Sequence, residues 1–240
     1  MAAERQPALR SPLRFAAEGI EGLVIAAATL ITWPLSRRWL ANWGSRPAER
    51  DRSWPGDELA PDAVRTFTRA ITVAADAEEV WPWVVQFGLG RAGFYSYELL
   101  ERLVRIPVRN VEAVMPEHQF LAVGDTIKLH PDAPGIPVAD VETGRRVCFG
   151  ESGPIGDTTP DPRRSWSIYI EPASPGACRV LVRTRIEALR APSWSKRVAL
   201  AVDGPMDFAM EQRMLRSIRR LVTSVEQPPP PPGRAASSAR

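Results

Sequence analysis

The chain has 240 residues, of which 44% are hydrophobic and 25% are charged, a composition typical of a globular protein with one sizeable domain. The formal net charge is +3, but the basic excess lies near the two ends, and residues 51–226 hold slightly more acidic than basic side chains. A folded region with this balance does not indicate nucleic-acid binding, so we expect no nucleic-acid partner.

Residues 22–35 form an uncharged run, GLVIAAATLITWPL, near the start of the chain. A comfortable membrane span needs about 20 apolar residues, so this run is short for one. It fits a short or tilted anchor, a signal-peptide core, an amphipathic helix in the membrane interface, or a helix docked on the domain. We expect residues 1–40 to form an N-terminal segment that contacts a membrane through residues 20–35, either as a single-pass or as a peripheral anchor.

Two further segments lack the pattern of a folded core. Residues 41–62 are polar and contain several prolines, which predicts a linker. Residues 227–240 begin with five prolines in a row, at 228–232, which predicts a disordered proline-rich tail. The folded domain is therefore expected at residues 63–226.

The first half of that domain predicts one strand and two helices. A β-prone run at residues 67–73 is followed by Asp76 and Glu79, which form a D-x-x-E capping box and start a helix. Pro82 lies inside this helix and predicts a tight or kinked first turn. A short second helix is expected from Ser96 to Leu103.

The second half predicts a strand meander and a long helix. Runs suited to strands, separated by glycine and proline, occupy residues 123–129, 136–142, 145–150, 165–172 and 178–188. Residues 206–222 carry apolar side chains at helical spacing and predict a long amphipathic helix facing a core. This order of elements indicates an α+β fold rather than alternating βαβ units.

Gly88, Gly90 and Gly93 spell G-x-G-x-x-G within QFGLGRAGFYSY. A dinucleotide-binding loop needs a strand before it and a helix after it inside a parallel βαβ unit, whereas here a helix comes first. We instead expect Gly88 or Gly90 to end that helix in the left-handed conformation and to turn the following aromatic residues inward. No cofactor is expected.

Metal-binding and disulfide chemistry are not indicated either. His118 and His130 are the only imidazoles, and they have no metal-ligand spacing. Cys148 and Cys178 fall in apolar, β-like runs and are interpreted as small buried thiols. We expect no metal site.

Alternation in the run CRVLVRTRIEA places three arginines on one face of a strand: Arg179, Arg183 and Arg185. The interpretation we favour is a solvated arginine face. If Arg183 or Arg185 instead faced a cavity, it would need a carboxylate or an anionic ligand to offset its desolvation.

Four strings of the sequence together resemble a known superfamily: AEEVWPWVVQFGLGRAGFYSYELLE, MPEHQFLAVGDTIKL, RSWSIYIEP and DFAMEQRML. They resemble a bacterial branch of the START-like helix-grip (SRPBCC) superfamily, the polyketide cyclase/dehydrase and lipid-transport grouping, over about residues 43–226. The resemblance implies a helix-grip fold, in which a curved antiparallel sheet wraps around the long C-terminal helix and a largely apolar cavity lies between them.

From this fold we expect binding of a hydrophobic small molecule or lipid, by a protein tethered to a membrane. The candidate ligand-binding residues are Trp83, Phe94, Tyr95, Tyr97, Trp166, Phe208 and Met214. No group of acidic, histidine or cysteine residues forms a catalytic set, so no catalytic residue is assigned. Two alternatives stay open: a cyclase or dehydratase in which Tyr95, Tyr97, Glu117 or an inward arginine polarises a carbonyl, and an interaction module with a vestigial cavity.

Overall fold

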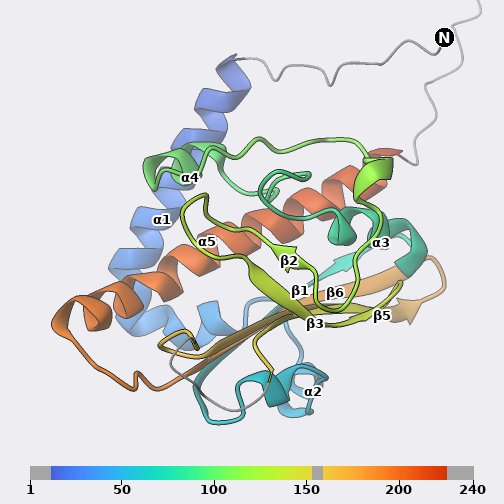
Figure 1. The fold of residues 1–240 in the computed structure, drawn as a ribbon. Helices are drawn as coiled ribbons and strands as arrows, with labels where there is room; N and C mark the ends of the chain where they lie inside the picture. Colours follow the sequence, from blue (N-terminus) through green and yellow to red (C-terminus); the bar gives the residue numbers. More distant parts are fainter. Residues whose placement is uncertain (1–11, 153–158, 226–240) are drawn as a thin grey trace, which may run out of the picture.

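The computed structural model describes residues 12–152 and 159–225, so the first eleven residues and the proline-rich tail predicted from residue 227 lie outside these ranges. Within them a six-stranded antiparallel sheet has the order β1-β6-β5-β4-β3-β2. The long helix α5 lies across one face of this sheet, and α1 lies against α5 (Figure 1). The elements, in chain order, are α1 (Pro12–Ala41), α2 (Pro47–Asp51), η1 (Asp57–Leu59), β1 (Ala63–Val73), α3 (Ala77–Val85), α4 (Glu98–Leu103), η2 (Pro116–His118), β2 (Thr126–Ile127), β3 (Ile136–Glu142), β4 (Arg146–Gly150), β5 (Arg164–Ser174), β6 (Ala177–Glu187) and α5 (Trp194–Val225).

The three longest strands, β1, β6 and β5, are neighbours at one side of the sheet, and β1 forms its edge. Strand β6 pairs with β1 on one side and β5 on the other, so the first and last strands of the sequence are neighbours. Val180 and Val182 of β6 are fully buried on the face that packs against Leu215 and Ile218 of α5. The predicted α+β helix-grip fold is therefore confirmed.

Helix α3 begins as predicted, but it ends differently. The capping box between Asp76 and Glu79 is present, and Pro82 lies inside the helix. The prediction of a left-handed glycine cap is wrong, because the cap residue is Gln86, whose φ is −88°. Gly88 and Gly93 exchange two backbone hydrogen bonds, of 3.0 and 3.1 Å, and all three glycines of this stretch have positive φ. Glycine is needed here to close the loop itself rather than to cap the helix.

Helix α5 starts twelve residues before the predicted start at Met206, at Trp194. Gly204 and Pro205 disfavour a helix interior and explain the later predicted start. Tertiary packing overrides this local preference, because the indole of Trp33 on α1 lies directly against Gly204. A Cβ atom at Gly204 would come within 2.4 Å of the Trp33 ring.

Residues 41–62, predicted as a linker, pack on the sheet face opposite α5. Trp54 and Leu59 are buried there in a cluster with Tyr169 and Leu181. The Trp54 and Tyr169 rings lie 4.4 Å apart, and the Tyr169 hydroxyl donates a 2.6 Å hydrogen bond to the carbonyl of Pro55. This segment, which includes α2 below the sheet in Figure 1, covers the outer face.

The arginines of β6 lie beneath this cover, so the prediction of a solvated face is wrong. Arg183 donates from Nε and Nη2 to the two carboxylate oxygens of Asp57, at 2.7 and 3.1 Å. Arg179 pairs in the same two-pronged way with Glu49, at 2.7 Å for both bonds. Arg185 donates to the carbonyl oxygens of Ala60 and Pro61. The arginines on the outer face of β6 therefore bind residues 41–62, which cover that face, instead of water.

Helix α1 packs closely on the domain through small residues. Gly22 lies against the ring of Tyr97, where a Cβ atom would come within 2.7 Å, and Gly19 lies equally close to Leu99. Ion pairs flank this contact, because Arg213 of α5 binds Glu18 at 2.9 Å and Glu21 at 3.5 Å. The helix is therefore docked on α4 and α5 by both shape and charge.

The buried pair of Arg183 and Asp57 yields a stability prediction. Asp57→Ala leaves Arg183 buried without its carboxylate, and we expect the free energy of unfolding to fall by about 3–5 kcal/mol. Asp51→Ala removes the same charge from the exposed end of α2 and is expected to change it by less than about 0.5 kcal/mol. Urea unfolding of the two variants checks this, and equal effects would contradict a buried arginine.

Candidate functional site

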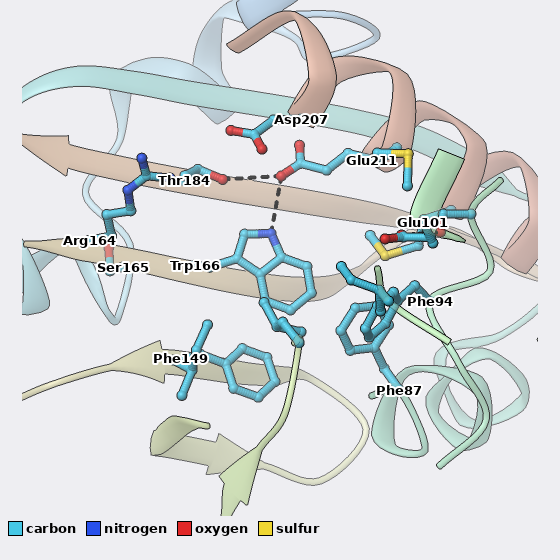
Figure 2. Close-up of a pocket in the computed structure, with 16 residues that line it drawn as sticks. Phe87, Phe94, Glu101, Phe149, Arg164, Ser165, Trp166, Thr184, Asp207 and Glu211 are labelled. Atoms are coloured by element: carbon cyan, nitrogen blue, oxygen red, sulfur yellow. Dashed lines mark hydrogen bonds between the residues drawn. The ribbon is translucent and has the colours of Figure 1, made fainter. Parts of the chain in front are cut away.

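A cavity of about 310 Å³ lies between α5 and the inner face of the sheet, with further walls from the 87–106 segment and the 129–136 loop (Figure 2). Aromatic and aliphatic side chains form most of the wall, and polar groups occupy parts of its rim. The lining residues are Phe87, Phe94, Ser96, Glu101, Ile106, Leu129, Ile136, Phe149, Arg164, Ser165, Trp166, Thr184, Asp207, Met210, Glu211 and Met214.

Four aromatic rings stack in sequence along one side of the cavity. Phe149 stacks on Trp166 with 5.1 Å between centroids, Trp166 lies 5.1 Å from Phe87, and Phe87 lies 5.2 Å from Phe94. Such contacts hold rings in fixed positions, and the rings, tilted by 28–41° to one another, form an apolar surface. This surface suits an aromatic or alicyclic guest.

The carboxylate of Glu211 on α5 is the centre of a hydrogen-bond network above the sheet. Its Oε1 atom accepts from the indole Nε1 of Trp166 at 3.1 Å and from the hydroxyl of Thr184 at 3.2 Å, as Figure 2 shows. Its Oε2 atom binds Nη1 of Arg69, a fully buried residue of β1. Arg69 also donates to the carbonyl of Leu40 near the end of α1, at 3.0 Å. The charge of Glu211 is thus offset by Arg69, and both of its carboxylate oxygens accept hydrogen bonds from the protein itself.

Glu101 on α4 is a second carboxylate in the wall, and it is only 6% exposed. The hydroxyl of Ser96 donates a 2.7 Å hydrogen bond to its Oε1 atom. Burial raises the pKa of Glu101 to about 7, and the Ser96 hydrogen bond lowers it by a smaller amount. A carboxyl group whose pKa is raised close to neutral pH by burial in a cavity is a common feature of binding and catalytic sites.

Three of the seven predicted ligand-binding residues line this cavity: Phe94, Trp166 and Met214. They come from the loop after α3, from β5 and from α5, and they meet only because the sheet and the helix fold over one another. Figure 2 shows Trp166 at the centre of the wall with Phe94 beside Phe87.

The other four predicted residues pack elsewhere in the core. Trp83 lies edge-on to Tyr95, with 6.3 Å between centroids, and the Tyr95 hydroxyl accepts a 2.7 Å hydrogen bond from Gln86. Tyr97 donates to Glu21 of α1 at 3.2 Å, and burial raises its pKa to about 12. Phe208 contacts the rings of Trp39 and Trp43 and faces away from the cavity toward α1. These four residues help to build the framework behind the wall.

Several lining residues were not predicted, above all Glu101 and Glu211. A signal for Glu211 exists, because it follows Phe208 by three residues and precedes Met214 by three, so it occupies a core position in an apolar stripe. Glu101 has no such signal, since α4 has six residues and a pattern that does not distinguish a buried from an exposed acid.

The groups considered for catalysis or metal binding are not gathered at the cavity. Tyr95, Tyr97 and Glu117 are not among its lining residues. In the described parts of the chain, no three His, Cys, Asp or Glu side chains cluster closely enough to hold a metal ion. Burial raises the pKa values of both Cys148 and Cys178 to about 11, which keeps these thiols protonated at neutral pH.

No protein-family model matches this sequence, and no curated protein is a detectable relative. Solved structures with a similar arrangement do exist. Norcoclaurine synthase from Thalictrum flavum, in complex with dopamine and hydroxybenzaldehyde, has a TM-score of 0.39 and 16% identity, covering 74% of this chain and 96% of that chain. Protein MLL2253 from Mesorhizobium loti has a TM-score of 0.38 and 14% identity, covering 68% and 100%. The protein Ara h 8.0201 has a TM-score of 0.36 and 14% identity, covering 67% and 98%.

These likenesses, with TM-scores below 0.5, assign neither a family nor a ligand. The function proposed below therefore rests on the cavity and on the surface of this chain.

The raised pKa of Glu101 predicts a specific pH dependence of stability. The folded protein holds a proton that the unfolded chain, with a pKa near 4.5, releases, so Glu101 makes the fold less stable as pH rises from about 4.5 to about 7. Glu101→Gln keeps an acceptor for Ser96 and is expected to raise the free energy of unfolding by up to ~3 kcal/mol above pH ~7, with little change near pH ~5. Urea unfolding across this range tests the expectation, with Glu117→Gln as an exposed control; a gain that does not vary with pH would contradict it.

Proposed function

We propose that the chain binds an apolar small molecule in the cavity between α5 and the sheet. The observation that carries this proposal is the cavity itself, about 310 Å³ in volume and bounded mainly by aromatic and aliphatic side chains. Protein interiors are normally close-packed, and a void of this size forfeits many contacts unless a guest supplies them. Apolar walls with a few placed polar groups are the usual character of small-molecule sites.

The volume limits the size of the guest. An engineered apolar cavity of about 150 Å³ takes up benzene, so a cavity about twice as large suits a molecule of about two rings. The series of rings from Phe149 to Phe94 offers such a molecule an aromatic surface. The resemblance of the sequence to the START-like grouping agrees with a role in holding an apolar guest.

We further propose that α1 lies in the surface of a membrane with its exposed face toward the lipid. The segment Pro12–Trp33 is long and apolar enough to cross a membrane. Its charged residues, however, pair with the domain: Glu18 and Glu21 bind Arg213, and Arg14 binds Glu112. A spanning helix would have to break these ion pairs and carry both carboxylates into the bilayer, at a cost of several kcal/mol.

The exposed face of α1 suits an in-plane arrangement. It carries no charge between Gly22 and Ser36, and Arg37, Arg38 and Trp39 follow at its end. Tryptophan favours the membrane interface, and arginine binds anionic headgroups there. The large apolar side chains on this face are Leu13, Ile20, Leu23, Val24, Leu30, Ile31, Leu35 and Trp39.

Filling the cavity should abolish binding. Leu129 lines the cavity, and Leu129→Trp adds a ring to its interior, whereas Leu103→Trp makes the same change at an exposed site outside it. We expect the affinity for naphthylethanol, measured by calorimetry, to fall at least ~10-fold in the first variant and to stay within ~2-fold of wild type in the second. Failure of the wild-type protein to bind any two-ring probe would overturn the cavity proposal.

Charges on the exposed face of α1 should release the protein from lipid. Ile31 and Leu35 are 79% and 94% exposed, so Ile31→Glu with Leu35→Glu should leave the fold intact while weakening binding to vesicles of phosphatidylcholine and phosphatidylglycerol. Val64 and Val123 are also exposed but lie outside α1, and their double glutamate variant is the matched control. We expect co-sedimentation to drop only in the α1 variant; equal sedimentation of all three proteins would refute the in-plane proposal.

A further inference from the structure

Glu101 differs from three other acidic residues that are largely removed from solvent, each of which pairs with an arginine. Glu49 is paired with Arg179, Asp57 with Arg183 and Glu211 with Arg69. Among the described residues, Glu101 accepts one side-chain hydrogen bond, from the neutral hydroxyl of Ser96. In residues 12–152 and 159–225 no cation pairs with it, and its carboxyl group forms part of the cavity wall.

The other charged groups around the cavity are already engaged within the protein. Glu211 binds Arg69, Trp166 and Thr184, and Arg164 and Asp207 each have interactions of their own. Figure 2 shows Arg164 on the far side of Trp166 from Glu101, while Phe94 lies near the carboxyl group. On its own helix, Glu98 and Arg102 pair with each other at 3.7 Å, and the Arg102 guanidinium lies over the ring of Phe15.

We propose that the guest is an amine of about two rings, whose ammonium group binds the carboxylate of Glu101 while its rings lie against Phe87, Phe94 and Trp166. This inference rests on the proposed function of the cavity and names the chemical class of its ligand. The one arginine of the wall, Arg164, lies on the far side of Trp166, so a cationic guest could supply the partner that Glu101 does not have among the described residues. Charge-assisted hydrogen bonds are stronger than neutral ones, and low local polarity strengthens them further.

The proton balance of this contact is simple. An ammonium group brings its own protons, so Glu101 must be ionised to pair with it. In the free protein burial holds the pKa of Glu101 at about 7, and the bound cation lowers it, so binding releases a proton from those molecules in which Glu101 is still protonated. Affinity for the amine should therefore rise as pH increases from about 6 to about 8, a range in which an alkylamine stays protonated.

Three probes with the same two rings and closely similar two-carbon side arms test the proposal: naphthylethylamine, naphthylethanol and naphthylacetate. Measured by calorimetry at pH ~8, the amine is expected to bind wild-type protein at least ~10-fold more tightly than the alcohol, and the carboxylate most weakly. In Glu101→Gln the amine should lose this advantage, while affinity for the alcohol stays within ~3-fold of wild type. The rise of amine affinity with pH should disappear in the same variant and persist in Glu117→Gln.

The outcomes separate the two proposals. If the alcohol binds wild-type protein as tightly as the amine, or if Glu101→Gln leaves amine affinity unchanged, the inference about the amine is wrong and the cavity still binds apolar guests. If none of the three probes binds, the proposed function fails as well. The pH dependence in wild-type protein needs no variant, so it tests the inference even if Glu101→Gln perturbs the fold.

Discussion

The ion pair between Arg69 and Glu211 is the contact on which the inner half of this molecule depends. Arg69 is fully buried on β1, and Glu211 brings Trp166 of β5 and Thr184 of β6 to the same carboxylate. One side chain of α5 therefore binds three neighbouring strands. Through the carbonyl of Leu40, Arg69 extends this network to the end of α1. A buried pair is costly to desolvate, and here three hydrogen bonds to the two carboxylate oxygens offset that cost, although Nη2 of Arg69 has no partner among the described residues.

This network also explains why a cavity exists beside it. The hydrogen bonds of Glu211 hold α5 at a set distance from the sheet. Apolar packing alone would favour a closer approach of the helix to the sheet. The rings of Phe149, Trp166, Phe87 and Phe94 then line the remaining space rather than fill it. Arginine–carboxylate pairs also lie on the outer face of the sheet. There Arg179 and Arg183 bind the segment that covers this face, and Trp54 and Leu59 fill the interface.

The sequence predicts the fold well because the strands and the last helix have strong local patterns. It fails where a long-range contact decides. The alternating arginines of β6 look like a solvated face, and only Trp54 and Leu59, two large apolar residues within an otherwise polar segment, indicate a cover.

At the site, Phe94, Trp166 and Met214 were predicted among the ligand-binding residues and do line the cavity. Glu101 was not, because burial of a carboxylate on a helix of six residues depends on α1 and α5 packing around it.

The close contact between α1 and α4 has a mechanical consequence. Gly19 and Gly22 let α1 lie directly on Leu99 and Tyr97, so α1 stands one layer behind the helix that carries Glu101. At these two positions the backbone of α1 directly contacts side chains of the 97–99 segment, so a displacement of α1 would be passed on to them. In the membrane-bound arrangement that we propose, a movement of α1 would therefore shift α4 and the carboxyl group of Glu101. Lipid binding by α1 and guest binding at Glu101 would then be coupled through the contact between α1 and α4.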